Sequence, residues 1–152
     1  MNREATIVLR SIVYVSTAVA PLTDGELEAL LVDSRDFNRK HSITGVLLYN
    51  DGSFMQCIEG PEAAIARTYA RIRASRRHKD IDELMNEPVP GRSFPSWDMG
   101  LARPPKSELL RLSTARWKAQ AGTARVGLPP SSGLELLRFL WQDWSTTGSC
   151  ST

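Results

Sequence analysis

The chain has 152 residues, 41% of them hydrophobic and 24% charged, a composition typical of one globular domain with room for some extra helices. Its formal net charge of +2 is too small to indicate nucleic-acid binding, and no apolar run approaches the roughly 20 residues of a membrane span. Two cysteines, Cys57 and Cys150, provide no disulfide framework and no metal-ligand spacing, and the charged N-terminus lacks a signal-peptide core, so we expect a cytoplasmic protein without a metal.

The first predicted element is a strand over residues 7 to 16, IVLRSIVYVS, which is rich in β-branched residues and expected to be central in a sheet. Tyr14 shares a face with Ile12 and Ser16. A half-buried tyrosine with its hydroxyl bonded to backbone is common at such a position, so Tyr14 alone does not indicate a functional site.

A helix should begin at the capping box Thr23-Asp-Gly-Glu26 and end before Ser42. Steps of three and four residues give it an inner stripe of Leu27, Leu31 and Ser34, and the next step of four reaches Asn38. The stripe therefore ends in an amide, which needs a polar partner.

The stretch after this helix predicts a β-hairpin. An apolar run from Ile43 to Tyr49 meets Asn50-Asp51-Gly52, whose residues readily adopt the positive φ of a tight turn. The return strand places Phe54, Gln56 and Ile58 on one face and Met55, Cys57 and Glu59 on the other. Gln56 is the anomaly, because a buried amide without partners costs roughly 1–3 kcal/mol for each unsatisfied group.

A second helix is expected to start at Gly60-Pro61, with Ile65, Tyr69 and Ile72 as its buried stripe. A basic cluster follows on its surface and at its C-terminal end: Arg67, Arg71, Arg73, Arg76, Arg77, His78 and Lys79. Cations near a helix C-terminus are favoured by the helix dipole and ordinarily face water. The alternative is a clamp for a ligand that carries phosphate.

Two further strands are predicted at Ile81 to Val89 and Ser93 to Ala102, with Trp97 and Met99 alternating onto one face of the last. Two split strand-helix-strand units give an α+β, ferredoxin-like βαββαββ sheet with both helices on one face. A flat aromatic ligand could lie between these helices, where Asn38 and Gln56 would converge.

The last third predicts a pair of helices over Lys106 to Gln120 and Ser131 to Trp144. The second carries two possible apolar stripes, one through Leu134, Leu137, Arg138 and Trp141 and one through Leu136, Leu140 and Trp144. We expect this segment, residues 104 to 152, to be separate from a domain spanning residues 1 to 103. It is too short for an enzyme domain, so we expect it to cap the sheet, to contact a partner, or to do both.

Five sequence features in order resemble the BLUF family of blue-light sensors that bind FAD: Tyr14, Asn38 before Ile43-Thr44-Gly45, the strand FMQCIEG from Phe54, Arg76-Arg77-His78, and Trp97-Asp98-Met99-Gly100. The match covers roughly residues 7 to 103. The resemblance implies a non-enzymatic, stand-alone photoreceptor that holds FAD non-covalently and signals by contact.

The resemblance also implies residue roles. Tyr14 would be the redox-active tyrosine, Gln56 the glutamine between it and the flavin, and Asn38 the asparagine at the flavin C4=O and N3 edge. Trp97 or Met99 would lie near Gln56 and complete the photoactive network. Arg71, Arg77 and His78 would lie near the ribityl and phosphate end of the cofactor. Phe37 departs from the family pattern, which often has a polar residue there.

We expect a homo-oligomer and a separate, unidentified effector or regulator protein as partners, with no nucleic acid and no membrane. Two alternatives remain open at this stage. One is a ferredoxin-like module that senses another small ligand without photochemistry. The other is a small hydrolase of the acylphosphatase type, but the segment after the first strand, Ser16-Thr-Ala-Val-Ala-Pro, lacks the glycines and arginine of a phosphate-binding loop.

Overall fold

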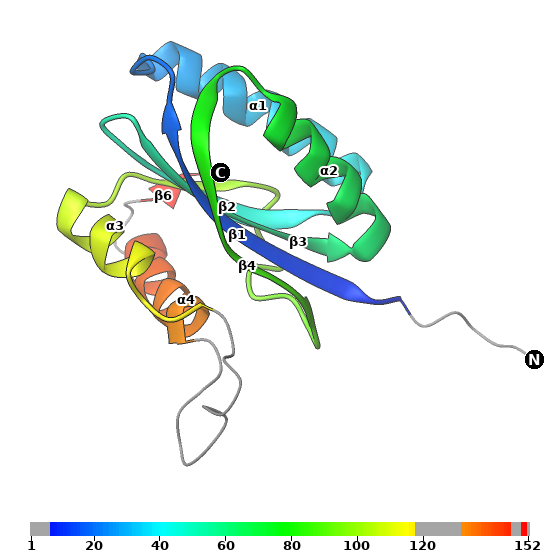
Figure 1. Ribbon diagram of the computed structural model, residues 1–152. Coiled ribbons are helices and arrows are strands. Elements are labelled where there is room, and N and C mark those ends of the chain that lie inside the picture. The colour runs from blue at the N-terminus through cyan, green and yellow to red at the C-terminus, as the bar shows by residue number, and fades with distance from the viewer. Residues whose placement is uncertain (1–6, 118–131, 147–149, 152) are drawn as a thin grey trace, which may run out of the picture.

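The computed structural model describes residues 7–117, 132–146 and 150–151 (Figure 1). The strands of the sheet are β1 Leu9–Ala18, β2 Thr44–Asn50, β3 Ser53–Pro61, β4 His78–Val89, β5 Gly100–Ala102 and β6 Cys150–Ser151, in the spatial order β4-β1-β3-β2-β5-β6. The helices are α1 Asp24–Lys40, α2 Glu62–Ala74, α3 Lys106–Ser113 and α4 Ser132–Thr146. The predicted α+β, ferredoxin-like arrangement is confirmed, because β4-β1-β3-β2 is the antiparallel core that two split βαβ units produce.

The predicted hairpin and the first helix form as their local signals indicate. β2 and β3 pair antiparallel, and the turn between them holds Asp51 at φ 46° and Gly52 at φ 87°. The Thr23 hydroxyl accepts from the Glu26 backbone N–H at 3.1 Å, while the Glu26 carboxylate accepts from the Thr23 backbone N–H at 2.9 Å. The bond from the Thr23 backbone N–H lowers the pKa of the Glu26 carboxyl, and the two bonds together complete the capping box at the start of α1.

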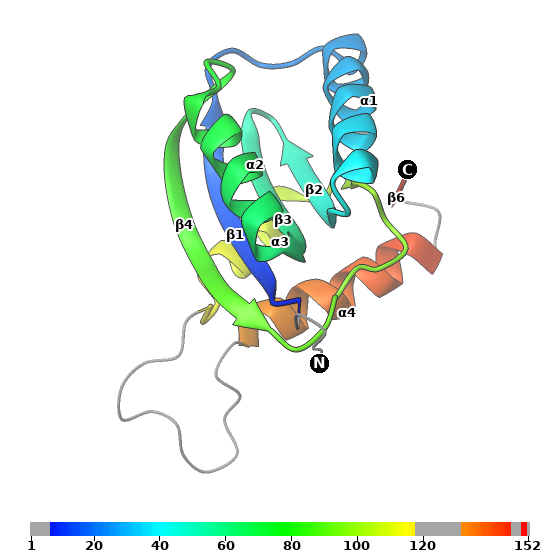
Figure 2. The same cartoon turned by 90° about the vertical axis from the view of Figure 1, so that its right-hand side faces the viewer.

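Helices cover both faces of the sheet. α1 and α2 lie side by side over one face, and α3 and α4 lie against the other (Figures 1 and 2). The first face packs Ile12, Ile58 and Leu47 against Leu31 and Ile65 of the helices. We call this the pocket face, and the second, built on Val13, Met55 and Cys57, the closed face.

The C-terminal helices complete the core on the closed face. The buried side of α4 combines the two predicted stripes, because Leu137, Leu140, Trp141 and Trp144 are buried while Arg138 is exposed. From α3, Leu109 and Leu112 join the same cluster. The α3 helix ends at Ser113, earlier than predicted, and residues 118–120 of the predicted helix lie outside the described residues.

Two expectations about the later elements are wrong. Arg76, Arg77 and His78 are not the end of a helix: Ser75 adopts an extended backbone, its hydroxyl accepts from the Arg77 N–H at 3.2 Å, and His78 begins β4. The strand expected from Ser93 is confined to Gly100–Ala102, because the segment before it turns through a bond from the Trp97 N–H to the Phe94 carbonyl at 3.2 Å.

This turn also corrects the expected placement of Trp97 and Met99. Alternation puts residues i and i+2 on one face only where the chain is extended. Here Met99 is buried in the pocket face, and Trp97 packs against the closed face with its ring 5.0 Å from that of Trp141.

Candidate functional site

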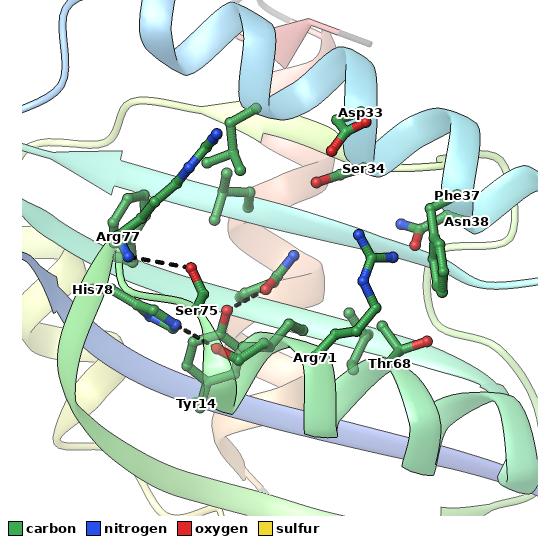
Figure 3. Close-up of a pocket in the computed structure, with 16 residues that line it drawn as sticks. Tyr14, Asp33, Ser34, Phe37, Asn38, Thr68, Arg71, Ser75, Arg77 and His78 are labelled. Atoms are coloured by element: carbon green, nitrogen blue, oxygen red, sulfur yellow. Dashed lines mark hydrogen bonds between the residues drawn. The ribbon is translucent and has the colours of Figure 1, made fainter.

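A cavity of about 290 Å³ lies between α1, α2 and the pocket face of the sheet (Figure 3). Its floor includes Tyr14 of β1, Leu47 of β2 and Gln56 of β3, and its sides come from α1, α2 and the turn before β4. The volume is close to the lower limit for small-molecule pockets, and the lining mixes apolar side chains with a few polar ones. The predicted site residues Tyr14, Asn38, Gln56, Arg71, Arg77 and His78 all line it.

Tyr14 and Gln56 form a hydrogen-bonded pair at the floor of the cavity. They lie directly opposite each other on β1 and β3, and the Tyr14 hydroxyl donates to Gln56 Oε1. Gln56 Nε2 contacts Met99 Sδ at 3.5 Å. Burial raises the pKa of Tyr14 well above its ordinary value, so the hydroxyl keeps its proton and remains a donor.

Asn38 is the buried amide at the end of the α1 stripe. Its Nδ2 donates to the Asp98 carbonyl at 2.6 Å, and no described residue donates to its Oδ1. The neighbouring Arg35 Nε donates to the Met99 carbonyl at 2.9 Å. α1 therefore holds the backbone of residues 98 and 99, and Asn38 keeps an acceptor available at the cavity.

The three basic residues take different places. Arg71 of α2 extends toward α1, with its guanidinium carbon 4.0 Å from the centre of the Phe37 ring, and Arg77 lies at the opposite end of the cavity (Figure 3). His78 uses both ring nitrogens within the protein: Nδ1 is 2.7 Å from Ser16 Oγ, and Nε2 donates to the Ile72 carbonyl at 2.8 Å. Its ring therefore fixes the start of β4 to β1 and α2.

Neither Trp97 nor Met99 lines the cavity, and of the two it is Trp97 that lies away from it. Its side chain lies on the closed face, whereas Met99 contacts Gln56 from the pocket face. Trp97 and Met99 are still linked by the backbone of residues 97–99, which is hydrogen-bonded to α1 on one side and to β2 on the other. Besides the bonds from α1, the Trp97 carbonyl accepts from the Gly45 N–H of β2 at 2.9 Å.

Sequence reasoning missed the role of Glu59, whose side chain is 1% exposed. Its carboxylate accepts from the backbone N–H groups of Ser93 and Phe94, both at 2.7 Å, and from the Thr44 hydroxyl at 2.9 Å. This buried anion holds the loop that leads to Trp97 against the sheet. The available signal was a charged residue in line with Met55 and Cys57 on one strand face.

The donor and acceptor set of the cavity fits a flavin ring. An isoalloxazine has a polar edge that alternates acceptors and a donor on an otherwise flat aromatic body. The cavity offers Asn38 Oδ1, the second Nε2 proton of Gln56 and the Arg71 guanidinium beside apolar walls.

Among the described residues, no three His, Cys, Asp or Glu side chains are placed to hold a metal ion. None of the described helices is long and apolar enough to cross a membrane.

Comparison with known proteins gives the same reading of residues 9–100, which match the sequence model described as "Sensors of blue-light using FAD". The photoactivated adenylate cyclase subunit beta of Euglena gracilis is 36% identical over 88 residues, which are 58% of this chain and 10% of that protein. The blue light- and temperature-regulated antirepressor BluF of Escherichia coli K12 is 33% identical over 69 residues, 45% of this chain and 17% of that protein. This chain thus spans about a tenth of the length of the cyclase subunit.

Comparison with solved structures leads to the same family. The dark-state structure of BlrB, a BLUF protein, has a TM-score of 0.60 and 35% identity, and the match covers 70% of this chain and 80% of that one. The photo-activated state of BlsA has a TM-score of 0.62 and 30% identity over 69% of this chain and 77% of that one. The family model matches a sensor module and not an enzyme domain. With more than half of its residues inside that model, and with the cavity described above at its centre, the chain belongs to the BLUF family of blue-light sensors that use FAD.

Proposed function

We propose that the cavity between α1 and α2 holds the flavin ring of FAD and that Tyr14, Gln56 and Met99 form the light-driven switch of this photoreceptor. The observation that carries the proposal is the orientation of one buried amide, with Gln56 Oε1 accepting from Tyr14 and Nε2 directed at Met99 Sδ. Asn38 would hold the imide edge of the ring through Oδ1.

FAD, when bound, supplies the absorption of blue light and accepts an electron in its excited state. Tyr14 is the tyrosine of the cavity floor, and burial keeps it neutral in the dark. A tyrosine that loses an electron becomes strongly acidic, and its hydroxyl hydrogen bond points to Gln56 Oε1. The proton therefore has a path along that bond, and the return of both the electron and the proton to Tyr14 leaves the amide free to settle in a different orientation.

The switch follows from the chemistry of the three side chains. A tyrosine hydroxyl donates or accepts, so it can bond either end of the Gln56 amide. A thioether sulfur accepts but cannot donate, so Met99 can pair with Nε2 and not with Oε1. Reversal of the amide thus preserves the Tyr14 bond and removes the Met99 contact, which gives two discrete states of the network.

Loss of the Met99 contact would be transmitted along residues 97–99 to the closed face. Trp97 packs edge-on against Trp141 of α4, so a shift of this segment changes the support of α4. We propose that α3 and α4 pass the signal by contact to a separate effector or regulator protein and also mediate a homo-oligomer contact. Relatives named as cyclase subunits and as an antirepressor support a sensor that acts on partners.

The test is to substitute the two polar members of the switch and keep their shape. Gln56→Leu and Tyr14→Phe should both bind FAD but lose the light-induced shift of the flavin absorption bands, because each variant lacks one hydrogen-bonding partner of the network. Cys57→Ala, the next residue on the opposite face, is the matched control and should keep the shift. A normal photocycle in Gln56→Leu would refute the proposed switch.

A further inference from the structure

Phe37, the residue at which this chain departs from the family pattern, is the centre of a three-layer stack at the cavity. The Arg71 guanidinium carbon lies 4.0 Å above its ring centre. The His41 ring stacks with it at 4.1 Å between centroids and 20° between planes. Because two groups at this distance cannot share one face of a single ring, Arg71 and His41 occupy opposite faces of Phe37.

The stack connects α1 with α2. Phe37 and Arg71 belong to different helices on the two sides of the cavity, and the Arg71 side chain reaches across it (Figure 3). His41 is itself fixed, since its Nδ1 lies 2.8 Å from the Phe37 carbonyl oxygen. The Phe37 ring is therefore held in place by His41, and the long, flexible Arg71 side chain stacks on it.

Stacking positions a guanidinium without using its hydrogen bonds. The five N–H donors of arginine lie in the guanidinium plane, and contact with an aromatic face leaves them free. No described residue accepts a hydrogen bond from Arg71 or forms an ion pair with it. A carboxylate or amide partner at residue 37 would instead consume some of these donors.

We propose that Phe37 is a positioning residue that holds Arg71 against a carbonyl oxygen on the imide edge of the flavin ring. The inference rests on the proposed flavin site. An imide edge presents acceptor, donor and acceptor, and the cavity provides the complementary order of Arg71 N–H, Asn38 Oδ1 and Gln56 Nε2. Phe37 immediately precedes Asn38, which places Arg71 at the imide end of the ring, away from the phosphate end expected from the family resemblance.

The experiment is a fluorescence titration of the cofactor-free full chain with riboflavin, FMN and FAD. Phe37→Leu should raise the Kd for all three flavins alike, by roughly threefold to tenfold, because the cation–π support of Arg71 is lost while the ring edge is common to the three ligands. Phe37→Tyr keeps an aromatic face and should bind as the parent chain does. Thermal melting of each variant checks that the fold is retained.

A double-mutant cycle separates positioning from general packing. Arg71→Ala should weaken binding at least as much as Phe37→Leu, and the double variant should bind no more weakly than Arg71→Ala alone. Three results would overturn the inference: an unchanged Kd in Phe37→Leu, additive losses in the double variant, or a loss confined to FMN and FAD, which would assign Arg71 to the phosphate. If the parent chain itself binds none of the three flavins, the proposed flavin site fails as well.

Discussion

The two faces of the sheet are built from alternate residues of the same strands, yet they have opposite character. On the pocket face, Tyr14 and Gln56 point into a cavity of about 290 Å³ that α1 and α2 leave between them. On the closed face, Val13, Met55 and Cys57 are covered by α3 and α4. One step along β3 therefore separates the lining of a cavity from a packed core.

The buried polar groups of the two faces also differ in how they are satisfied. Glu59 on the closed side has its carboxylate filled by two backbone N–H groups and the Thr44 hydroxyl. On the pocket face, no described residue donates a hydrogen bond to the Oδ1 of the buried Asn38. Buried polar groups normally find partners, so the difference indicates that a ligand completes the pocket face, while the protein completes the closed face.

The largest expected effect of a single change is on the closed face. Trp141→Ala should lower the free energy of unfolding by about 3–5 kcal/mol, because it removes a buried indole that packs against Trp97, Trp144 and Phe94. No described residue accepts a hydrogen bond from the Trp141 Nε1, so the loss reports packing alone. Urea unfolding measures the effect, and Phe139→Ala on the exposed side of α4 is the control, with a change below about 0.5 kcal/mol.

A smaller effect on stability is expected for Glu59, the buried carboxylate on the closed side of the sheet. Glu59→Gln should cost about 2 kcal/mol, because one carboxylate oxygen becomes an NH₂ group that faces the backbone N–H of Ser93 or Phe94. Glu28→Gln on the exposed side of α1 is the matched control and should leave stability unchanged in the same denaturation experiment. Equal stability of the two variants would mean that the loop before Trp97 does not depend on this carboxylate.

The free energy of unfolding at alkaline pH depends on one residue from each face, Tyr14 and Cys57. Burial raises the pKa of both the Tyr14 hydroxyl and the Cys57 thiol in the folded chain, so above about pH 9–10 these groups deprotonate in the unfolded state first. Stability is then lost as pH rises, by about 1.4 kcal/mol per pH unit for each group. Tyr14→Phe and Cys57→Ala should each reduce the slope of unfolding free energy against pH, and an unchanged slope in both would contradict this assignment.

The smallest change in stability is expected at the outer surface of the C-terminal helices. Phe139 of α4 is 67% exposed and Leu110 of α3 is 63% exposed, so Phe139→Ser and Leu110→Ser should each alter stability by less than about 0.5 kcal/mol. If these helices mediate self-association, the variants should shift the full chain toward monomer in light scattering. Point variants suit this purpose better than removal of the helices, which would uncover the closed face.

The sequence predicts those parts of the fold that depend on local signals. The capping box at Thr23, the turn at Asp51-Gly52 and the alternation on β3 each act within a few residues, and each is found where expected. Gln56 and Asn38 were identifiable because an amide in an apolar pattern requires a partner.

The remaining features depend on contacts between distant segments. The face taken by Trp97 is decided by the turn from Phe94 to Trp97 together with bonds to Glu59 and Gly45, and these last two residues belong to distant strands. The stack of Arg71 on Phe37 likewise requires the two helices to be placed side by side. Periodicity therefore predicted a longer strand than the one that forms.

The central claim, that the pocket face is an FAD-based light switch, is tested most directly by the absorption spectrum of the purified full chain before and after blue light. We expect a yellow protein whose flavin bands move slightly to the red on illumination and return in the dark, with the flavin remaining oxidised, because only hydrogen bonds around it change. A colourless protein that cannot be reconstituted with FAD would contradict the claim, as would bleaching of the flavin bands on illumination.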